Sequence, residues 1–369
     1  MTATTPPASA ATIAAGQDSL AGPATAGPAA VPLASDRPLH EVYDVALLDL
    51  DGVVYRGQGP VPGAPEALAR AKAAGQRRAF VTNNASRSPA AIAAHLSRLG
   101  VPASAADVVT SAQAAARLLA RQLPAGARVL VVGGNGLRIA LRERGLRPVS
   151  TAAEQPAAVV QGFAPDMSYG LLSEGVLAIR AGAVYVASNA DRTFPTARGS
   201  ELGNGSLVAA IAYATGVQPV VAGKPEPPLH AEAVERTGAK RPLVIGDRLD
   251  TDIEGAVRGG AHSLLVLTGV TRPADVVLAP PQQRPSYLAT DLSGLLEPHP
   301  AVTAAGGGWQ CRGWTARAVG PGGPLELTGS GDAIDGHRAA CAAVWQAGPG
   351  GPGSAEDVRD ALGKLSLPS

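Results

Sequence analysis

Short apolar runs alternate with helix-forming stretches along most of this 369-residue chain. The run at 44–50 precedes a helical pattern at 64–75, and the run at 77–84 precedes another at 88–100. Further apolar runs occur at 127–133, 158–163, 183–188, 241–247 and 262–269. This alternation is typical of parallel sheets that are covered by helices on both faces. We therefore expect an α/β fold with a doubly wound, Rossmann-like parallel sheet at its core.

The composition limits the classes of partner. Hydrophobic residues make up 46% of the chain and charged residues 17%, so most of the sequence can bury a core. The net charge is +1 and basic residues do not cluster with aromatic ones, so we expect no nucleic-acid partner. No apolar run reaches the ~18–20 residues of a membrane span, so we expect no membrane partner either.

The two ends of the chain differ from its middle. Residues 1–40 are mostly Ala, Pro, Thr, Ser and Gly, which predicts a disordered tail, and they lack the basic start of a signal peptide. All three tryptophans and both cysteines lie in residues 301–369, where strands at 309–328 and a helix at 332–346 indicate a small C-terminal domain. For Cys311 and Cys341 we favour free thiols in a cytoplasmic protein over a disulfide.

Two carboxylates follow the first apolar run. Asp49 and Asp51 come directly after Val45–Leu48, and Gly52 allows a sharp turn there. The carboxyl ends of parallel strands lie at the mouth of the sheet, where ligands bind in open α/β folds. Two nearby carboxylates repel unless a cation lies between them or one is protonated. Both conditions suit phosphoryl transfer, with Mg²⁺ beside an ionised nucleophile and the second acid as a proton carrier. The alternative is a helix cap followed by a turn aspartate.

Later strand ends carry groups that complement these acids. Thr82, Asn83 and Asn84 offer a hydroxyl and amides that can bind phosphate oxygens without adding charge. Lys224 stands between a glycine and a proline, which favours a compact, fixed ammonium that neutralises a phosphoryl group. This lysine is one of only four in the chain. The alternatives are a simple turn for the first segment and a solvated surface lysine for the second.

A second acidic cluster follows the apolar run at 241–247. It contains Asp247, Asp250 and Asp252, and Mg²⁺ prefers a few carboxylates together with water and phosphate. The alternative is a helix N-terminus with acidic residues that complement its dipole. Because four strand ends carry complementary chemistry in order, we favour a magnesium-dependent phosphate site.

The four segments, in this order, resemble the motifs of the haloacid dehalogenase superfamily of phosphohydrolases. Their spelling is that of the subfamily with a large α/β cap between the second and third motifs. The resemblance covers residues 41–300 and implies a core at 41–105 and 220–300 with an inserted cap at 106–219. In detail it is closest to actinobacterial glycerol 3-phosphate phosphatases. Those also carry a small C-terminal α+β domain that resembles part of an acetyltransferase, here 301–369.

The resemblance also implies roles for individual residues. Asp49 attacks phosphorus and forms an aspartyl phosphate, while Asp51 protonates the leaving group and then activates water. Mg²⁺ binds the Asp49 carboxylate, the Asp51 main-chain carbonyl and Asp247, with Asp252 beside these ligands or joined through water. The substrate's phosphoryl oxygens are held by the second and third motifs, that is by Thr82, Asn83, Asn84 and Lys224.

The cap is expected to select the substrate. Phe194 stands where pyridoxal phosphatases carry a histidine, which weakens a pyridoxal phosphate assignment, and we expect it to form an apolar wall or simply cap core. Gly203 and Gly205 precede a helix and are expected to offer backbone amides to the substrate. Arg192 and Arg198 are interpreted as solvated. The glycine-rich stretch at 131–136 has the wrong spacing for a dinucleotide loop, so we interpret it as a tight strand–helix turn.

Taken together, these features favour a cytoplasmic, Mg²⁺-dependent phosphatase of a small phosphate monoester, with sn-glycerol 3-phosphate as the first choice. The alternative substrate is 2-phosphoglycolate. From a different class, the chain could be a ligand-sensing or regulatory protein whose phosphatase core is secondary. An acetyltransferase is disfavoured because residues 301–369 are short and contain no convincing pyrophosphate-binding loop. A homo-oligomer is compatible with the resemblance, since caps of this subfamily often mediate dimers.

Overall fold

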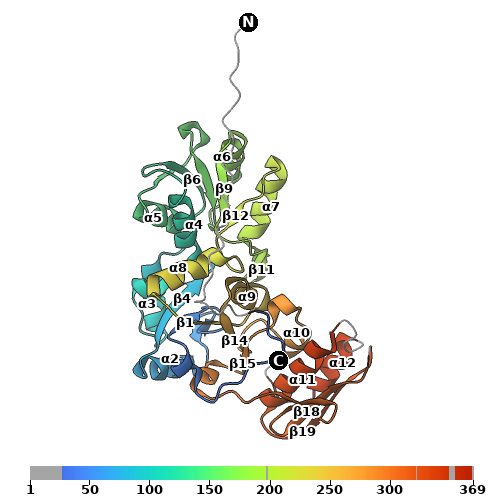
Figure 1. Cartoon of the computed structure of the whole chain (residues 1–369). Helices are drawn as coiled ribbons and strands as arrows, with labels where there is room; N and C mark the ends of the chain where they lie inside the picture. The colour runs from blue at the N-terminus through green and yellow to red at the C-terminus, as the bar shows by residue number, and fades with distance from the viewer. Residues whose placement is uncertain (1–26, 197, 321, 349–353, 368–369) are drawn as a thin grey trace. The chain divides into compact units, whose positions relative to one another are not determined.

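The computed structural model describes residues 27–196, 198–320, 322–348 and 354–367 (Figure 1). The chain divides into two compact units. The described part of the first unit comprises Thr82–Ile92 and Val109–Glu232. That of the second comprises residues 27–81, Ala93–Val108 and the residues from Ala233 onward. Each unit has its own apolar core.

A six-stranded sheet forms the centre of the second unit, in the order β15-β14-β13-β1-β4-β5. The strands are β1 (Val45–Leu48), β4 (Arg77–Thr82), β5 (Val108–Thr110), β13 (Pro242–Gly246), β14 (His262–Val266) and β15 (Tyr287–Ala289). The central strands pair in parallel, with Leu48 opposite both Phe80 and Ile245. Every residue of β1 and β13 is buried, as a sheet covered on both faces requires. The expected parallel α/β core is confirmed.

Helices connect these strands. They are α1 (Leu39–Val42), α2 (Ala64–Ala73), α3 (Pro89–Arg98), α8 (Pro227–Thr237), α9 (Glu254–Gly259) and α10 (Pro273–Val277), of which α3 and α8 have residues in both units. Helix α2 shows why the sequence pattern predicted a helix here. It buries Ala64, Ala67, Leu68 and Ala71 on one face, and it ends before Gly75, whose φ of +92° continues no helix. A short hairpin of β2 (Tyr55–Arg56) and β3 (Gly59–Pro60) follows β1.

Residues 27–40 differ from the sequence expectation. Composition placed them in a disordered tail, but the Leu33 N–H donates to the Ser286 carbonyl at 2.8 Å. Ser35 and His299 exchange two backbone hydrogen bonds, each 2.8 Å long. Leu39 is fully buried. The prediction of disorder is therefore wrong for this stretch, because backbone hydrogen bonds and buried apolar residues such as Ala29 and Leu39 hold it in place. Composition alone does not reveal these contacts. Residues 1–26 lie outside the described residues.

The first unit contains a five-stranded sheet in the order β12-β9-β8-β6-β7, with all recorded pairs parallel. Its strands are β6 (Arg128–Val132), β7 (Arg147–Val149), β8 (Ala158–Gln161), β9 (Val184–Ala187) and β12 (Val220–Val221). Its helices are α4 (Ser111–Ala120), α5 (Asn135–Glu143), α6 (Tyr169–Arg180) and α7 (Asn204–Thr215), and β10 (Thr193–Thr196) forms a hairpin with β11 (Gly199–Leu202). This sheet and its helices form the α/β cap.

The glycine-rich stretch of the cap permits close packing at the start of α5. A Cβ atom at Gly136 would lie 2.3 Å from the Ala85 carbonyl oxygen, and one at Gly133 would lie 2.6 Å from the Gly162 carbonyl oxygen. Neither position tolerates a side chain without a shift of the backbone. The glycines therefore allow α5 to pack closely against neighbouring backbone, which agrees with a tight strand–helix connection.

The C-terminal region belongs to the second unit. Strands β16 (Thr303–Ala305), β17 (Gly308–Cys311), β18 (Trp314–Ala318) and β19 (Leu325–Gly329) form an antiparallel sheet, and α11 (Ala333–Ala347) and α12 (Ala355–Leu362) pack on it (Figure 1). Its apolar residues form one cluster with those of α10 and β14. Cys311 and Cys341 are buried free thiols. Among the described residues, no helix is long and apolar enough to cross a membrane.

A buried arginine of α11, Arg338, forms an ion pair within the helix and a hydrogen bond to the core sheet. Arg338 donates to Asp335 at 2.6 Å and to the carbonyl of Leu288, the middle residue of β15, also at 2.6 Å. Arg312 approaches the same carboxylate at 3.3 Å. Burial, with a contribution from Arg338, lowers the pKa of His299 to about 4. Its neutral ring can therefore accept a hydrogen bond from Arg338 at 3.3 Å.

We expect Asp335→Ala to lower the free energy of unfolding by about 3–5 kcal/mol, because the buried Arg338 guanidinium loses its counter-charge. Urea unfolding of both proteins measures this change. The matched control is Glu41→Ala, which removes an exposed ion pair with Arg37 at 3.3 Å and should cost about 1 kcal/mol or less. Equal losses in the two variants would contradict the argument from burial.

Candidate active site

Three carboxylates gather at the carboxyl ends of β1 and β13. Asp49, Asp247 and Asp252 each offer an oxygen atom, and these atoms lie within 4.8 Å of one another. Asp49 directly follows β1, and its N–H donates to the Ile245 carbonyl at 2.8 Å. Asp247 directly follows β13, and Asp252 lies in the π-helical turn Leu249–Ile253. The strands are parallel neighbours, so their ends meet at one edge, as the sequence predicted for Asp49 and Asp247.

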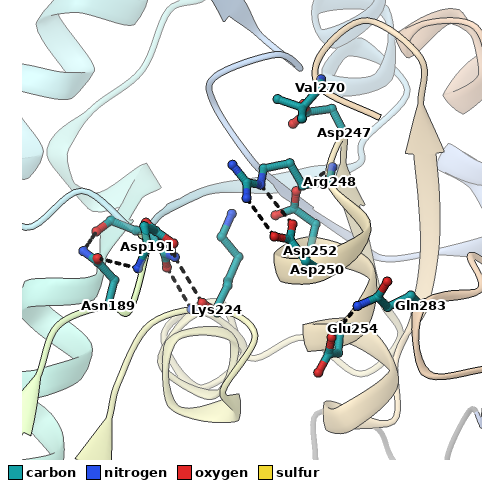
Figure 2. A network of polar contacts seen from close by, with 11 residues as sticks. Asn189, Asp191, Lys224, Asp247, Arg248, Asp250, Asp252, Glu254, Val270 and Gln283 are labelled. Atoms are coloured by element: carbon teal, nitrogen blue, oxygen red, sulfur yellow. Dashed lines mark hydrogen bonds and ion pairs between the residues drawn. The ribbon is translucent and has the colours of Figure 1, made fainter. Parts of the chain in front are cut away.

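The backbone around Asp247 is shaped to hold its carboxylate. The side chain is only 1% exposed, and the Val270 N–H donates to Oδ2 at 2.7 Å (Figure 2). A Cβ atom at Gly269 would lie 1.9 Å from Oδ2, and one at Gly52 would lie 2.6 Å from it. Gly52 also has a φ of +86°, which glycine adopts without strain. Two glycines thus let the chain close around one buried acid.

This donor set fits a divalent cation. Asp247 and Asp252 are each 1% exposed, and three ionised carboxylates so close together repel unless a cation or a proton compensates them. Carboxylate oxygens are the ligands that Mg²⁺ prefers in proteins. Asp250 is not part of this group. It is exposed and forms a two-point ion pair with Arg248, at 2.8 and 3.1 Å (Figure 2).

Asp51 lies at the turn that leads into the β2–β3 hairpin. Its backbone bridges to Tyr55, and the Gly52 N–H donates to the Tyr55 carbonyl at 2.8 Å. Part of the side chain is exposed, yet burial of its carboxyl group raises the pKa of Asp51, while a backbone hydrogen bond from Gly52 lowers it somewhat. A raised pKa keeps the acid protonated to higher pH, which is the direction that a proton donor needs.

Thr82 and Asn84 form a turn at the end of β4. Thr82 is 9% exposed, and its Oγ1 accepts from the Asn84 N–H at 3.1 Å. The exposed Asn84 side chain accepts from the backbone N–H groups of Ser86 at 2.9 Å and Arg87 at 3.1 Å. The Asn84 side-chain oxygen therefore stabilises a turn, as the alternative interpretation of this segment expects. Its role as a phosphate ligand remains a prediction.

Lys224 is buried in the first unit, at 3% exposure, so it is not a solvated surface lysine. The Asn83 side chain forms two hydrogen bonds with the Lys224 backbone. Oδ1 accepts from the Lys224 N–H at 2.8 Å, and Nδ2 donates to the Lys224 carbonyl at 3.1 Å. Nδ2 also lies 3.2 and 3.3 Å from the two Asp191 carboxylate oxygens. Figure 2 shows Asp191 and Asn189 beside the Lys224 backbone.

Asp191 and Asn189 were not identified from the sequence. The Asn189 side chain donates to the Asn83 carbonyl at 2.8 Å, so both residues belong to the same network as Lys224. A signal for them does exist. They follow β9 (Val184–Ala187) as Thr82 ends β4, and a polar stretch directly after a buried strand is the pattern that located the other motifs.

Two cap predictions require correction. Gly203 and Gly205 do not present free amides, because their N–H groups donate to the carbonyls of Arg192 and Asp191, both at 2.8 Å. Added Cβ atoms would lie 2.2 Å from the carbonyl oxygens of Asp191 and Ala190, respectively. These glycines are therefore explained by close backbone packing rather than by ligand recognition.

Phe194 lies on β10 and is half-buried. Its ring packs edge-on against Phe163, with centroids 4.7 Å apart. This contact agrees with a role in cap packing. The half-buried ring is equally compatible with an apolar wall, so the substrate-binding role of Phe194 stays a prediction. Arg192 and Arg198 are exposed, as expected.

Comparisons with known proteins identify similar sequences and a similar fold. A family model described as haloacid dehalogenase-like hydrolase matches residues 46–147, a second model of that kind matches 221–295, and a GCN5-related N-acetyltransferase-like domain matches 311–367. A D-glycerol 3-phosphate phosphatase of Mycobacterium tuberculosis is 47% identical over 84% of this chain and 88% of its own length. A 5′-nucleotidase of Bacillus subtilis is 38% identical over 63% of this chain and 90% of its own.

A solved structure of high similarity is a glycerol phosphate phosphatase from Mycobacterium tuberculosis in complex with magnesium. It has a TM-score of 0.80 and 45% identity, and the match covers 90% of this chain and 99% of that one. The chain therefore belongs to the haloacid dehalogenase-like hydrolase family. The resemblance inferred from the four motifs and the phosphoric monoester hydrolase class are confirmed.

Proposed function

We propose that this protein is an Mg²⁺-dependent phosphatase that hydrolyses sn-glycerol 3-phosphate to glycerol and phosphate. The observation that carries the substrate is the extent of similarity. The relative named as a D-glycerol 3-phosphate phosphatase matches 84% of this chain, whereas the 5′-nucleotidase matches 63%. The additional match includes sequence beyond the shared phosphatase core.

The three-carboxylate group supplies the metal ligands in this proposal. Asp49, Asp247 and the Asp51 main-chain carbonyl would hold Mg²⁺, with Asp252 as a further ligand or a hydrogen-bond acceptor for bound water. When bound, the cation neutralises charge on the phosphoryl group and on the surrounding carboxylates. The Val270 N–H donates to Oδ2 of Asp247 and helps to hold this carboxylate beside Asp49 and Asp252.

Asp49 and Asp51 divide the chemistry between them. An ionised Asp49 oxygen attacks phosphorus, the bond to the glycerol oxygen breaks, and the phosphoryl group is carried as an acyl phosphate. Asp51 gives its proton to the departing alkoxide. It then takes a proton from the water that attacks the aspartyl phosphate, which releases inorganic phosphate and restores Asp49.

Thr82 and Lys224 are proposed to bind the phosphoryl oxygens. The Thr82 hydroxyl can donate a hydrogen bond, and the Lys224 ammonium adds a compact positive charge that a buried setting strengthens. Phosphoryl transfer depends largely on such positioning and charge neutralisation. We further propose the domain limits 41–105 with 220–300, 106–219 and 301–369, together with a cytoplasmic location.

The runner-up substrate, 2-phosphoglycolate, differs by a second negative charge. A site that selects it needs a cation aimed at that carboxylate, and the cap arginines considered from the sequence, Arg192 and Arg198, are exposed. We expect kcat/KM for glycerol 3-phosphate to exceed that for phosphoglycolate by about tenfold or more, which is about 1.4 kcal/mol of selectivity.

Steady-state kinetics with both substrates and Mg²⁺ measures this ratio in wild type, Arg192→Ala and Arg198→Ala. Neither variant should change the ratio by more than about twofold, because exposed arginines contribute little. If wild type prefers phosphoglycolate and one substitution abolishes that preference, the runner-up is correct. A complete lack of turnover on any monoester would instead favour a ligand-sensing protein.

A further inference from the structure

Asn83 has no side-chain donor to spare for a substrate. Its amide group makes a cyclic pair with the Lys224 backbone, accepting from the N–H at 2.8 Å and donating to the carbonyl at 3.1 Å. The second N–H of the amide faces the Asp191 carboxylate, with Nδ2 3.2 and 3.3 Å from its oxygens. An asparagine amide has two donor hydrogens, and both are engaged here.

Asp191 helps to determine which way this amide points. In the observed orientation the Asn83 oxygen meets the Lys224 N–H, and the NH₂ group meets two acceptors. A rotation of the amide by 180° would place its oxygen against the Asp191 carboxylate and the Lys224 carbonyl, and its NH₂ group against an N–H. All three contacts would then be repulsive. The carboxylate therefore adds to the two Lys224 backbone contacts that favour the observed orientation.

The Asn83 backbone is fixed from two further elements. Its carbonyl accepts from the Ser111 hydroxyl at the start of α4, at 2.6 Å, and from the Asn189 amide at 2.8 Å. A Cβ atom at Gly223 would lie 2.6 Å from Asn83 Oδ1, so the glycine before Lys224 is needed for this close approach. The Asn83 backbone is thus held by hydrogen bonds, and close packing at Gly223 holds the backbone before Lys224.

A fixed backbone matters for a long side chain. Holding the N–H and the carbonyl of one residue sets the direction of its Cα–Cβ bond, and hence the region that the ammonium can reach. A displacement of about 1 Å at a catalytic group can cost on the order of 10²-fold in rate. The 3% exposure of Lys224 leaves it little alternative space in which to compensate.

We propose that Asn83 and Asp191 are positioning residues that act on the reaction through Lys224, and that Asn83 does not bind substrate through its side chain. This inference rests on the proposed function, in which Lys224 neutralises the phosphoryl group. Asp191 contributes as a hydrogen-bond acceptor that orients the Asn83 amide, so its negative charge is not essential.

The experiment is a double-mutant cycle in the full-length protein with Mg²⁺ and p-nitrophenyl phosphate. Asp191→Ala removes the acceptor and should lower kcat by about 10–10²-fold. Asp191→Asn keeps one acceptor oxygen and should recover activity to within about threefold of wild type. Because Asp191 acts through Lys224, adding Asp191→Ala to Lys224→Ala should cause no further loss beyond about twofold.

Glu174→Ala serves as the matched control. Glu174 is also a half-buried carboxylate of the first unit, and it accepts from the Ala152 N–H at 2.6 Å without joining the Asn83 network. It should alter the thermal midpoint but not kcat. Thermal melts of each variant separate misfolding from mispositioning, and the isosteric Asp191→Asn tests the idea even if Asp191→Ala is unstable.

The outcomes are distinguishable. An inactive wild-type protein, or a fully active Lys224→Ala variant, would refute the proposed function. Losses for Asp191→Ala and Lys224→Ala that multiply in the double variant would overturn the positioning role, since the residues would then act independently. A loss in Asp191→Asn as large as in Asp191→Ala would show that charge, rather than amide orientation, is what Asp191 supplies.

Discussion

Replacing Asp49 by asparagine is expected to reduce turnover of phosphate monoesters to background while the fold persists. The amide has the size of the carboxylate but lacks the ionised oxygen that attacks phosphorus. Loss of a covalent nucleophile costs on the order of 10⁴–10⁶ in kcat. Without metal, the thermal midpoint should stay equal or rise, because one of three carboxylates within 4.8 Å of each other loses its charge.

Kinetics at saturating Mg²⁺ and thermal melts in EDTA test the two halves of this prediction. The melts should also show a smaller upward shift on adding Mg²⁺, since stabilisation by a ligand follows its affinity. Asp250→Asn is the matched control. It removes an exposed acid of the Leu249–Ile253 turn that pairs with Arg248, and its kcat should stay within about threefold of wild type. Activity of Asp49→Asn within about tenfold of wild type would contradict the aspartyl phosphate mechanism.

Two acids of the three-carboxylate group could be located from the sequence because one physical rule links them. Asp49 and Asp247 each directly follow a fully buried strand. Buried parallel strands read as continuous apolar runs, and the carboxyl ends of such strands lie at one edge of the sheet. The proximity of two acids almost 200 residues apart thus follows from local patterns alone. Asp252 is placed beside these acids only through the family resemblance, because its position depends on the irregular turn Leu249–Ile253, which no periodicity indicates.

The positioning network could not be located in the same way. Asn83 and Asp191 meet across 108 residues of sequence, and the choice between binding a substrate and holding Lys224 depends on which atoms face the amide. Gly203 and Gly205 show the same limit. A glycine before a helix predicts accessible amides or close packing equally well, and only the carbonyls of Arg192 and Asp191 decide between them.

Asp51 is expected to differ from Asp49 in the step that it serves. Asp51→Asn should retain Mg²⁺ binding, because the proposed ligand is its main-chain carbonyl, but it cannot deliver a proton. We expect kcat for glycerol 3-phosphate to fall by about 10²–10⁴-fold, as when a general acid is lost. The loss for p-nitrophenyl phosphate should be smaller, because a nitrophenolate departs with little protonation.

The comparison of two substrates on one variant provides its own control, since a general disturbance of the site would affect both alike. Asp49→Asn offers the contrast, because a missing nucleophile removes activity whatever the leaving group. Metal titration followed by thermal stability tests whether Asp51→Asn still binds Mg²⁺. Equal losses on the alkyl and the aryl substrate would count against proton donation. A simultaneous loss of the Mg²⁺-induced stabilisation would assign the Asp51 side chain to metal binding instead.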